Sequence, residues 1–420
     1  MVNVLVVGSG GREHALSWKL SQSDLVDEVF VAPGNGGTSQ NIQISADDID
    51  ALANFAQEKS CFTVVGPEAP LANGLVDKFT EKGLSVFGPS KQAAQLESSK
   101  IWAKEFMKRN NIPTADFEIF DNAQKAKEFV STYDKQVVIK ADGLAAGKGV
   151  IVCTNNDEAN DAIDKILVKK EFGDAGSKII IEERIDGIEA SYIALCDGQV
   201  GIPMATSQDH KRIYDNDKGP NTGGMGAYSP TPVIDNKLGS VIQEQIIAKT
   251  ISSMTKEGIE FRGFLYAGIM IRDGKPYVLE YNVRMGDPEC QPILMRLDSD
   301  LYKYLKASSE GKLNDLAEIS WKDESSVCIV LASNGYPNSY PKGDEITGLS
   351  DTSPNSFVFH AGTKNKDGKI VSNGGRVLGV TALGASLNDA INNAYSTAQK
   401  IHWKNKYQRN DIGKKGLSYL

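Results

Sequence analysis

The sequence has few of the residues that build metal clusters and disulfide frameworks. It contains five cysteines and four histidines in 420 residues, and no two cysteines form a Cys-x-x-Cys pair. Each cysteine stands in or near an apolar run, which is typical of a buried thiol. The histidines lack the paired spacing of a zinc site. We therefore expect neither a disulfide scaffold nor a zinc centre.

Long apolar runs and an excess of positive charge are also missing. No stretch approaches the roughly 18 consecutive apolar residues of a membrane-spanning helix. The chain starts on an apolar strand pattern without the charged region of a signal peptide, so we expect a cytoplasmic protein with no membrane partner. The net charge is −8, from 46 basic and 54 acidic residues. No nucleic-acid partner is expected, although local basic pockets for small anions are still allowed.

Glycine, in contrast, is abundant, and the chain is long enough for several hydrophobic cores. The 40 glycines and the 40% apolar content are typical of a globular protein with many tight turns. A chain of 420 residues exceeds the size at which a single core keeps growing. At roughly 100 to 200 residues per domain, it is expected to form two to four domains.

Residues 1 to about 95 alternate strand and helix patterns. An apolar strand at 2–7 meets a glycine-rich turn and a helix at 13–20. Further strands are expected at 29–31, 62–65 and 85–87, with helices at 49–57 and 71–82 between them. This alternation predicts a parallel sheet whose strand ends bind a ligand.

The rest of the chain predicts a small α+β module and antiparallel sheets. Residues 90–109 are predicted as one helix, which ends before Pro113. The turns Asp197-Gly198 and Asp273-Gly274 each join two apolar strands, as in β-hairpins. After a helix at 301–310, short strands from about residue 325 indicate a further body. No internal repeat is evident, which disfavours a solenoid.

The segment at 140–149 is a candidate phosphate-binding loop. It links two strand patterns and carries three glycines and two lysines, so its backbone amides can approach an anion. It is not a P-loop, because Gly149 stands where a Ser or Thr would contact magnesium. An ordinary flexible hairpin loop is the alternative. The other motifs are needed to distinguish it from a phosphate-binding loop.

Two strand ends carry carboxylates that suit a metal–nucleotide complex. The segment at 179–185 places Glu182 and Glu183 at the end of a strand, where backbone groups can bind a purine while Glu189 reaches a ribose. Glu280 and Asn282 are two residues apart on another strand, hence on one face, and offer the oxygen ligands that magnesium prefers. Solvated acidic strand ends are the alternative in both cases.

Three polar loops are candidates for substrate binding. The long stretches at 207–212 and 219–226 are rich in charge and glycine, and such loops inside a domain are usually functional or disordered. The opening turn at 8–13 follows a strand and precedes a helix, where a phosphate can bind. Glu13 stands where a dinucleotide-binding fingerprint needs glycine, so NAD is disfavoured, and Arg12 favours a phosphate monoester.

Together these segments resemble the ATP-grasp superfamily and, within it, the phosphoribosylamine–glycine ligase family. The resemblance spans the chain and is carried by VVGSGGREHAL, VAPGN, VVGPEAPL, FGPS, VIKADGLAAGKGV, FGDAG, ATSQDHKR, GPNTGGMGAYSP, GFLYAG, FHAGT and NGGRVL. It implies an α/β and α+β fold with an N-terminal Rossmann-like substrate-binding domain at 1–100. An ATP-grasp lid with a leading helix follows at 101–190, a central ATP-grasp domain at 191–325 and a small mixed C-terminal domain at 326–420.

The resemblance also implies residue roles. Catalytic roles go to Arg284, Lys140 and Asp209. The nucleotide would be bound by Lys104, Lys140, Gly143, Gly147, Lys148, Gly149, Glu182, Glu183, Ile185 and Glu189. A Mg²⁺ or Mn²⁺ ion would be held by Glu280 and Asn282. The substrates would be bound by Gly10, Gly11, Arg12, Glu13, Pro67, Glu68, Asp209, Lys211, Arg212, Asn221, Thr222, Gly223, Gly224 and Asp287.

Some positions depart from the family pattern. The family usually has Phe where Arg184 and Met285 stand, and backbone contacts to adenine tolerate the first change. Many superfamily members carry another metal carboxylate on the preceding strand, where Ile269 and Met270 stand. We therefore expect one metal ion.

The implied reaction joins glycine to 5-phosphoribosylamine with ATP, by way of a glycyl phosphate, in de novo purine biosynthesis. The loop at 140–149 would close as a lid that shields this intermediate from water. Transient contact with neighbouring pathway enzymes is a further expectation. The alternatives are another ATP-grasp carboxylate–amine ligase, a nucleotide-binding regulator without turnover and, last, a nicotinamide oxidoreductase.

Overall fold

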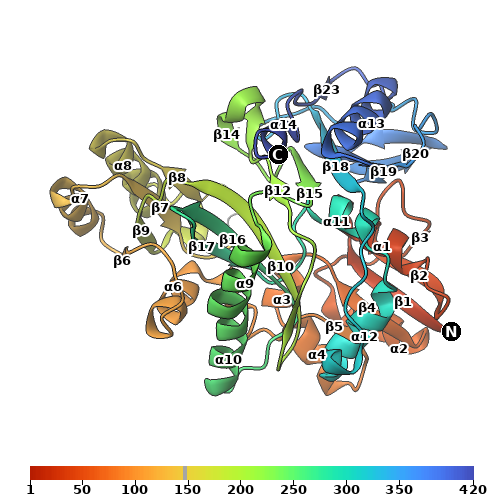
Figure 1. Cartoon of the computed structure of the whole chain (residues 1–420), viewed down its shortest axis with the longest axis horizontal. Coiled ribbons are helices and arrows are strands. Elements are labelled where there is room, and N and C mark those ends of the chain that lie inside the picture. Colours follow the sequence, from red (N-terminus) through yellow and green to blue (C-terminus); the bar gives the residue numbers. More distant parts are fainter. Residues whose placement is uncertain (145–148) are drawn as a thin grey trace.

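A computed structural model describes residues 1–144 and 149–420 (Figure 1). The N-terminal part forms a five-stranded sheet in the order β3-β2-β1-β4-β5, and every neighbouring pair is parallel. Its strands are β1 (Val2–Gly8), β2 (Val26–Pro33), β3 (Gln40–Asn41), β4 (Cys61–Val65) and β5 (Val86–Phe87). The core residues of β1 are buried on both faces, because helices and other strands cover the sheet. The parallel sheet expected from the sequence is confirmed.

Two helices of this part match the sequence pattern, and one predicted helix is divided. They are α1 (Gly11–Leu20), α2 (Ile49–Glu58), α3 (Glu68–Ala72) and α4 (Leu75–Glu81). The single helix predicted at 71–82 is wrong, because Gly74 adopts a positive φ of 89° between α3 and α4. The single helix predicted at 90–109 is also wrong. It is divided into α5 (Gln95–Ser98) and α6 (Lys100–Arg109), where extended Ser99 caps α6 by accepting a bond from the Trp102 amide.

The next part is a small module that projects away from the rest of the molecule (Figure 1). Its antiparallel sheet has the order β6-β9-β7-β8. One apolar cluster drawn from residues 126–181 forms its core. Its elements are β6 (Phe117–Phe120), α7 (Ala123–Thr132), β7 (Val137–Ala141), β8 (Val150–Val152), α8 (Asn156–Ile163), which continues into a π-helical turn to Val168, and β9 (Ile179–Glu183). This module, which we call the lid, therefore has a hydrophobic core of its own.

The centre of the molecule is a four-stranded antiparallel sheet in the order β11-β10-β16-β17. Both predicted hairpins are confirmed: Asp197-Gly198 joins β10 to β11, and Asp273-Gly274 joins β16 to β17. Asp273 and Gly274 both have positive φ, which suits a tight two-residue turn. The elements are β10 (Ile188–Asp197), β11 (Gly201–Pro203), β16 (Arg262–Arg272), β17 (Lys275–Asn282), α9 (Asn236–Ile242), α10 (Lys249–Lys256), α11 (Cys290–Arg296) and α12 (Leu301–Glu310).

A second large sheet collects strands from two distant parts of the sequence. Its order is β12-β15-β18-β22-β19, and β23 pairs with β18. The members are β12 (Gln208–Asp209), β15 (Gly226–Ser229), β18 (Ser325–Ser333), β19 (Ser356–His360), β22 (Arg376–Gly384) and β23 (Lys406–Tyr407). The hairpins β13 (Arg212–Tyr214) with β14 (Lys218–Asn221) and β20 (Thr363–Lys366) with β21 (Lys369–Ser372) flank it, with α13 (Leu387–Lys400) and α14 (Lys414–Leu417). The polar stretches at 207–212 and 219–226 are thereby anchored to the C-terminal part.

The N-terminal, central and C-terminal parts share apolar cores. Phe62 of β4 packs edge-on against Tyr302 of α12, and Phe87 of β5 packs against Phe264 of β16. Residues of α11 contact α1 as well as β18 and β22. These shared cores fix the strand ends of the N-terminal sheet against the central sheet, which is where the predicted site residues meet.

Two expectations from composition can be compared with the fold. All five cysteines are buried and unpaired, as expected for structural thiols, and burial raises the pKa of Cys61 and Cys153 to about 11. Within residues 1–144 and 149–420, no helix has the length and apolar character needed to cross a membrane.

Acidification below about pH 6.5 is expected to destabilise the fold, because three histidines are buried without charge. Burial lowers the pKa of His14 and His210 to about 3 and that of His360 to about 4. An unfolded chain takes up these protons near pH 6.5 whereas the folded chain does not, so stability is lost as the pH falls. Each histidine contributes up to about 1.4 kcal/mol per pH unit in this window.

Thermal unfolding between pH 7.5 and pH 5 measures this effect. His14 Nδ1 accepts a bond from the His360 amide at 2.8 Å, so His14→Gln keeps an acceptor while it removes the titration. The variant should show a smaller loss of Tm on acidification than the parent. His402→Gln is the control, since His402 is exposed and should leave the pH slope unchanged. A Tm that stays constant down to pH 5 would contradict the prediction.

Candidate active site

Two lysines and one glutamate form a buried charged cluster between the lid and the central sheet. Lys140 of β7 lies 3.0 Å from Glu182 of β9, and Lys104 of α6 lies 3.2 Å from the other oxygen of the same carboxylate. Lys140 also donates to the Leu279 carbonyl of β17 at 2.9 Å, which joins the lid to the central sheet. Burial lowers the pKa of Lys104 to about 8, against the attraction of Glu182. Two ammonium groups thus share one carboxylate, which leaves this cluster with positive charge.

The strand end at Glu183 offers a backbone edge beside these lysines. The Glu183 amide donates to Asp116 at 2.9 Å, and the Glu183 side chain pairs with Lys135 and Arg272. Ile185 is buried, and in the described part of the chain its amide forms no backbone bond. This leaves a donor that can bind the edge of a purine. Lys135 and Arg272 hold the Glu183 side chain, so this side chain is not the part that a ligand would bind.

Glu280 and Asn282 lie on one face of β17, as the spacing predicts, and both are half-buried. Burial alone would raise the pKa of Glu280, but Lys211, Lys140, Lys100 and Arg284 lower it below its usual value. Glu280 is therefore an ionised carboxylate that four basic side chains of this region stabilise. Its oxygens and the Asn282 amide oxygen are hard ligands, and no group of three or more His, Cys, Asp or Glu suited to a metal occurs in the described residues. Two such ligands fit a magnesium ion that takes its other ligands from phosphates and water.

Arg284 connects the central sheet to the N-terminal part. Its Nη2 atom lies 2.7 Å from Glu97 of α5, and its Nε atom lies 3.3 Å from Glu68 at the start of α3. Glu97 also accepts a bond from the Val283 amide at 2.7 Å. Burial raises the pKa of Glu97 despite Arg284, whereas Arg284 and Arg12 lower the pKa of Glu68 against the effect of its burial. Two acids of the N-terminal part thus fix the guanidinium, which also helps to lower the pKa of Glu280.

The stretch at 207–212 contributes two charged groups to the same region. Lys211 pairs with Glu189, and its pKa is raised well above the usual value because Glu189, Asp209 and Glu280 outweigh its burial. Burial, with Glu289 and Glu189 nearby, raises the pKa of Asp209 to about 8, although Lys211 opposes this. Asp209 and Glu280 thus both act on the charge of Lys211, and their roles in substrate binding stay predictions.

Other predicted residues lie elsewhere. Arg212 turns away from this region and donates to the Gly219 carbonyl at 2.6 Å inside the β13–β14 hairpin, where it pairs with Asn221. His210 is buried and accepts a bond from the Gly413 amide at 3.3 Å, in keeping with a structural role. Gly147 and Lys148 lie outside the described residues.

The opening turn of the chain is closed by carboxylates. The Gly10 amide donates to Glu13 at 2.6 Å, and Glu13 fits beside Gly8 and Gly66, where any Cβ would overlap its side chain. Arg12 pairs with Glu13 at 2.5 Å and donates to the Met285 carbonyl at 3.1 Å. The glycines of this turn thus make room for a buried acid at the start of α1, where the sequence suggested a phosphate.

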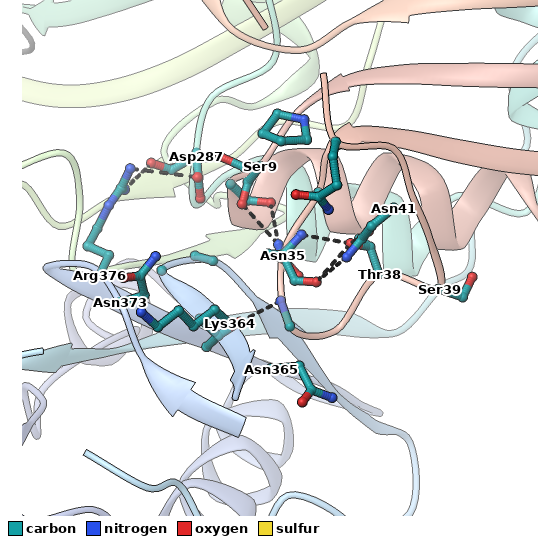
Figure 2. A pocket seen from close by; sticks show the side chains of 18 residues that line it. Ser9, Asn35, Thr38, Ser39, Asn41, Asp287, Lys364, Asn365, Asn373 and Arg376 are labelled. Carbon is teal, nitrogen blue, oxygen red and sulfur yellow. Dashed lines mark hydrogen bonds and ion pairs between the residues drawn. The ribbon is translucent and has the colours of Figure 1, made fainter. Parts of the chain in front are cut away.

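A cavity of about 830 Å³ opens beside this turn, between the N-terminal sheet and the C-terminal part (Figure 2). One wall comes from the ends of β1 and β2 and the loop that follows, and the other from residues 361–365 with Asn373 and Arg376. Gly10 and Asp287, two predicted substrate-binding residues, are part of its lining. Asn35 holds the two walls together, since its Nδ2 donates to the carbonyls of Ser9 and His360 at 3.0 and 2.8 Å.

Arg376 is the main residue of this site that sequence reasoning missed. Its Nη1 atom donates to the Gly223 carbonyl at 2.6 Å and to the Asp287 carbonyl, while Nη2 lies 3.6 Å from the Asp287 carboxylate. Tyr336 accepts a bond from the Gly223 amide at 3.0 Å. The C-terminal part thereby fixes the loop at 222–224 and Asp287 around the cavity. The stretch NGGRVL was the one signal of this role in the sequence.

Three family patterns match successive parts of the chain. They are described as the N domain of phosphoribosylglycinamide synthetase at residues 2–97, its ATP-grasp (A) domain at 98–290 and its C domain at 326–415. The chain is 51% identical to the phosphoribosylamine–glycine ligase of Vibrio vulnificus strain CMCP6 over 99% of both chains. It is 51% identical to that of Haemophilus influenzae over 98% of both.

Solved structures give the same picture at the level of the fold. The phosphoribosylamine–glycine ligase of Thermotoga maritima is 34% identical with a TM-score of 0.83, over 98% of this chain and 100% of that one. The biotin carboxylase domain of the Hydrogenobacter thermophilus 2-oxoglutarate carboxylase is 16% identical, with a TM-score of 0.72 over 97% of this chain and 91% of that one. This second likeness concerns the fold alone.

Proposed function

Because the chain belongs to the phosphoribosylglycinamide synthetase family, we propose that its site joins glycine to 5-phosphoribosylamine at the expense of ATP. The products are glycinamide ribonucleotide, ADP and phosphate, in purine biosynthesis. The observation that carries this proposal is the position of Glu280 on β17, next to the Leu279 carbonyl that binds Lys140 of the lid, where four basic side chains lower its pKa despite burial. Such a site suits a reaction in which two anions must meet.

The nucleotide fits the region between the lid and the central sheet. Lys104 and Lys140 are the partners we assign to its phosphates, since they share a single carboxylate. The backbone at Glu183 and Ile185 would bind the adenine edge. Glu189 is assigned to the ribose, and in this role it would be shared with Lys211. Gly143 and Gly149 belong to the glycine-rich segment at 140–149, which we assign to the phosphates.

A divalent ion would be held by Glu280, Asn282 and the nucleotide phosphates. We propose magnesium, with manganese as the substitute, because both prefer oxygen ligands. When bound, the ion neutralises phosphate charge and so favours phosphoryl transfer. Ile269 and Met270 supply no further carboxylate, which is why we keep one ion as the expectation.

The first step transfers the γ-phosphoryl group to glycine. A carboxylate oxygen of glycine attacks the γ-phosphorus, the bond to ADP breaks, and glycyl phosphate forms. Arg284 and Lys140 neutralise the charge that both reactants carry, and Glu68 and Glu97 keep Arg284 in place. No covalent enzyme intermediate is required by this arrangement.

The second step forms the amide bond. The amine of 5-phosphoribosylamine attacks the carbonyl carbon of glycyl phosphate, phosphate leaves, and the amine loses a proton. Asp209 and Lys211 would orient charged substrate groups, and the substrate amine would enter from the cavity past Gly10, Gly11, Thr222, Gly223, Gly224 and Asp287. The roles of Pro67 and Arg212, the domain boundaries, a cytoplasmic location and contact with neighbouring enzymes stay predictions.

Release of ADP with each substrate omitted in turn tests the proposal. We expect release to require ATP, glycine, 5-phosphoribosylamine and a divalent ion together, and to be unaffected by bicarbonate. Release that depends on bicarbonate, or on another amine in place of 5-phosphoribosylamine, would assign the chain to a different ATP-grasp ligase. Absence of any ATP turnover would leave a nucleotide-binding regulator.

A further inference from the structure

The cavity between the N-terminal and C-terminal parts is lined by several exposed polar side chains. In the described residues, no hydrogen bond or ion pair is formed by the side chains of five lining residues: Ser9, Ser39, Gln43, Lys364 and Asn373. Figure 2 shows Lys364 and Asn373 on the C-terminal wall and Ser9 and Ser39 on the opposite wall. Two hydroxyls, two amides and one ammonium group face a volume of about 830 Å³. This set of donors and acceptors matches a phosphorylated sugar.

The start of α1 is not available for the phosphate of such a ligand. Glu13 already accepts the Gly10 amide at 2.6 Å, and Asp287 accepts the Arg12 amide. The guanidinium of Arg12 is engaged by Glu13 and by the Met285 carbonyl. A dianionic phosphate placed there would meet two carboxylates, which repel it. The phosphate must therefore bind in another part of the cavity.

The charges of the cavity come from two cations and one acid. Its cations, Lys364 and Arg376, both come from the C-terminal wall. Arg376 is committed to the Gly223 and Asp287 carbonyls, so Lys364 is the cation with all its donors open to a ligand. The acid, Asp287, lies beside Gly10 and 3.6 Å from Arg376. A ligand with an amine at one end and a phosphate at the other fits with its amine next to Asp287 and its phosphate next to Lys364.

We propose that the C-terminal wall of this cavity is the subsite for the phosphate monoester of the amine substrate, with Lys364 as its cationic partner. The proposal rests on the proposed function for the identity of that substrate. Asn373 shares the phosphate from the same wall, while Ser9, Ser39 and Gln43 bind sugar hydroxyls from the opposite wall. Arg376 is a positioning residue, because it holds Asp287 and the loop at 222–224 rather than the phosphate. The amine then points toward Arg284 and Glu280, where the acyl phosphate forms.

Binding of ribose 5-phosphate tests the subsite without turnover, with ribose as the probe that lacks the phosphate. By calorimetry, the full chain should bind ribose 5-phosphate more tightly than ribose. Lys364→Met should weaken ribose 5-phosphate binding about 10-fold or more while ribose binding stays the same, and Lys364→Arg should restore part of the loss. Lys366→Met is the matched control, since Lys366 lies two residues further along the same exposed strand and does not line the cavity.

Steady-state kinetics supply a second measurement. In the ligase assay, Lys364→Met should raise the KM for 5-phosphoribosylamine and leave kcat and the KM values for ATP and glycine near those of the parent. The subsite is refuted if Lys364→Met binds ribose 5-phosphate like the parent, if Lys366→Met loses as much, or if ribose binds as tightly as ribose 5-phosphate. Because the binding experiment needs no reaction, its outcome is separate from that of the proposed function.

Discussion

Replacing Arg284 with alanine is expected to lower kcat/KM for ADP formation by about 10³-fold. The guanidinium follows β17 directly and helps to lower the pKa of Glu280, and we place the approach of the glycine carboxylate to the γ-phosphate there. Removal of one charged group that stabilises a transition state in a buried site typically costs a factor of about 10² to 10³. The loss should appear mainly in kcat, because the charge on the transferred phosphoryl group is greatest in the transition state.

A second variant separates this catalytic effect from a loss of stability. Arg284→Ala leaves the buried Glu97 carboxylate without its cation, which is expected to destabilise the fold by about 1–3 kcal/mol. Arg284→Ala combined with Glu97→Gln removes the unpaired charge, so the midpoint of denaturant unfolding should recover while turnover stays low. Arg109→Ala is the control, since Arg109 forms an exposed pair with Glu257 that should contribute little. Full activity in the double variant would exclude a direct role for Arg284.

The elements that follow a strong local pattern could be predicted from the sequence. The parallel sheet was predicted because valine-rich strands alternate with helices between residues 1 and 95, and the two hairpins because Asp-Gly turns separate apolar runs. The pair Glu280 and Asn282 could be placed on one face because side chains alternate along a strand. The two broken helices were missed because apolar periodicity continues across Gly74 and Ser99, although the backbone changes direction there.

The contacts between distant residues could not be predicted in this way. Glu97 pairs with Arg284 across 187 positions, and Arg376 reaches Gly223 across 153. Neither contact leaves a periodic signal, because each depends on how separate parts of the chain pack. The same applies to the closing of the α1 turn by Glu13 and Asp287. Local spacing predicts an open phosphate site there, and only the packed structure shows that two acids occupy it.

Glu280 offers a sharper test, because its replacement is expected to change two measurements in opposite directions. The carboxylate faces Lys100, Lys140, Lys211 and Arg284, and it repels the phosphates that these cations attract. Glu280→Gln removes that repulsion at nearly constant volume. Binding of ATP without a divalent ion should therefore become equal or tighter. The gain in ATP affinity on adding Mg²⁺ should shrink, because the ion loses its charged protein ligand.

Turnover of Glu280→Gln should fall by about 10²- to 10³-fold, since the ion can no longer be held against the transferred phosphate. Calorimetric titration of ATP with and without Mg²⁺ gives the two affinities, and ADP release gives the rate. Glu257→Gln is the control for loss of one carboxylate, because Glu257 forms the exposed pair with Arg109 and should leave all three quantities unchanged. If Glu280→Gln weakened ATP binding equally with and without Mg²⁺, Glu280 would support the shape of the nucleotide site rather than hold the ion. If Glu280→Gln changed neither ATP affinity, the phosphates alone would have to neutralise the cations around position 280.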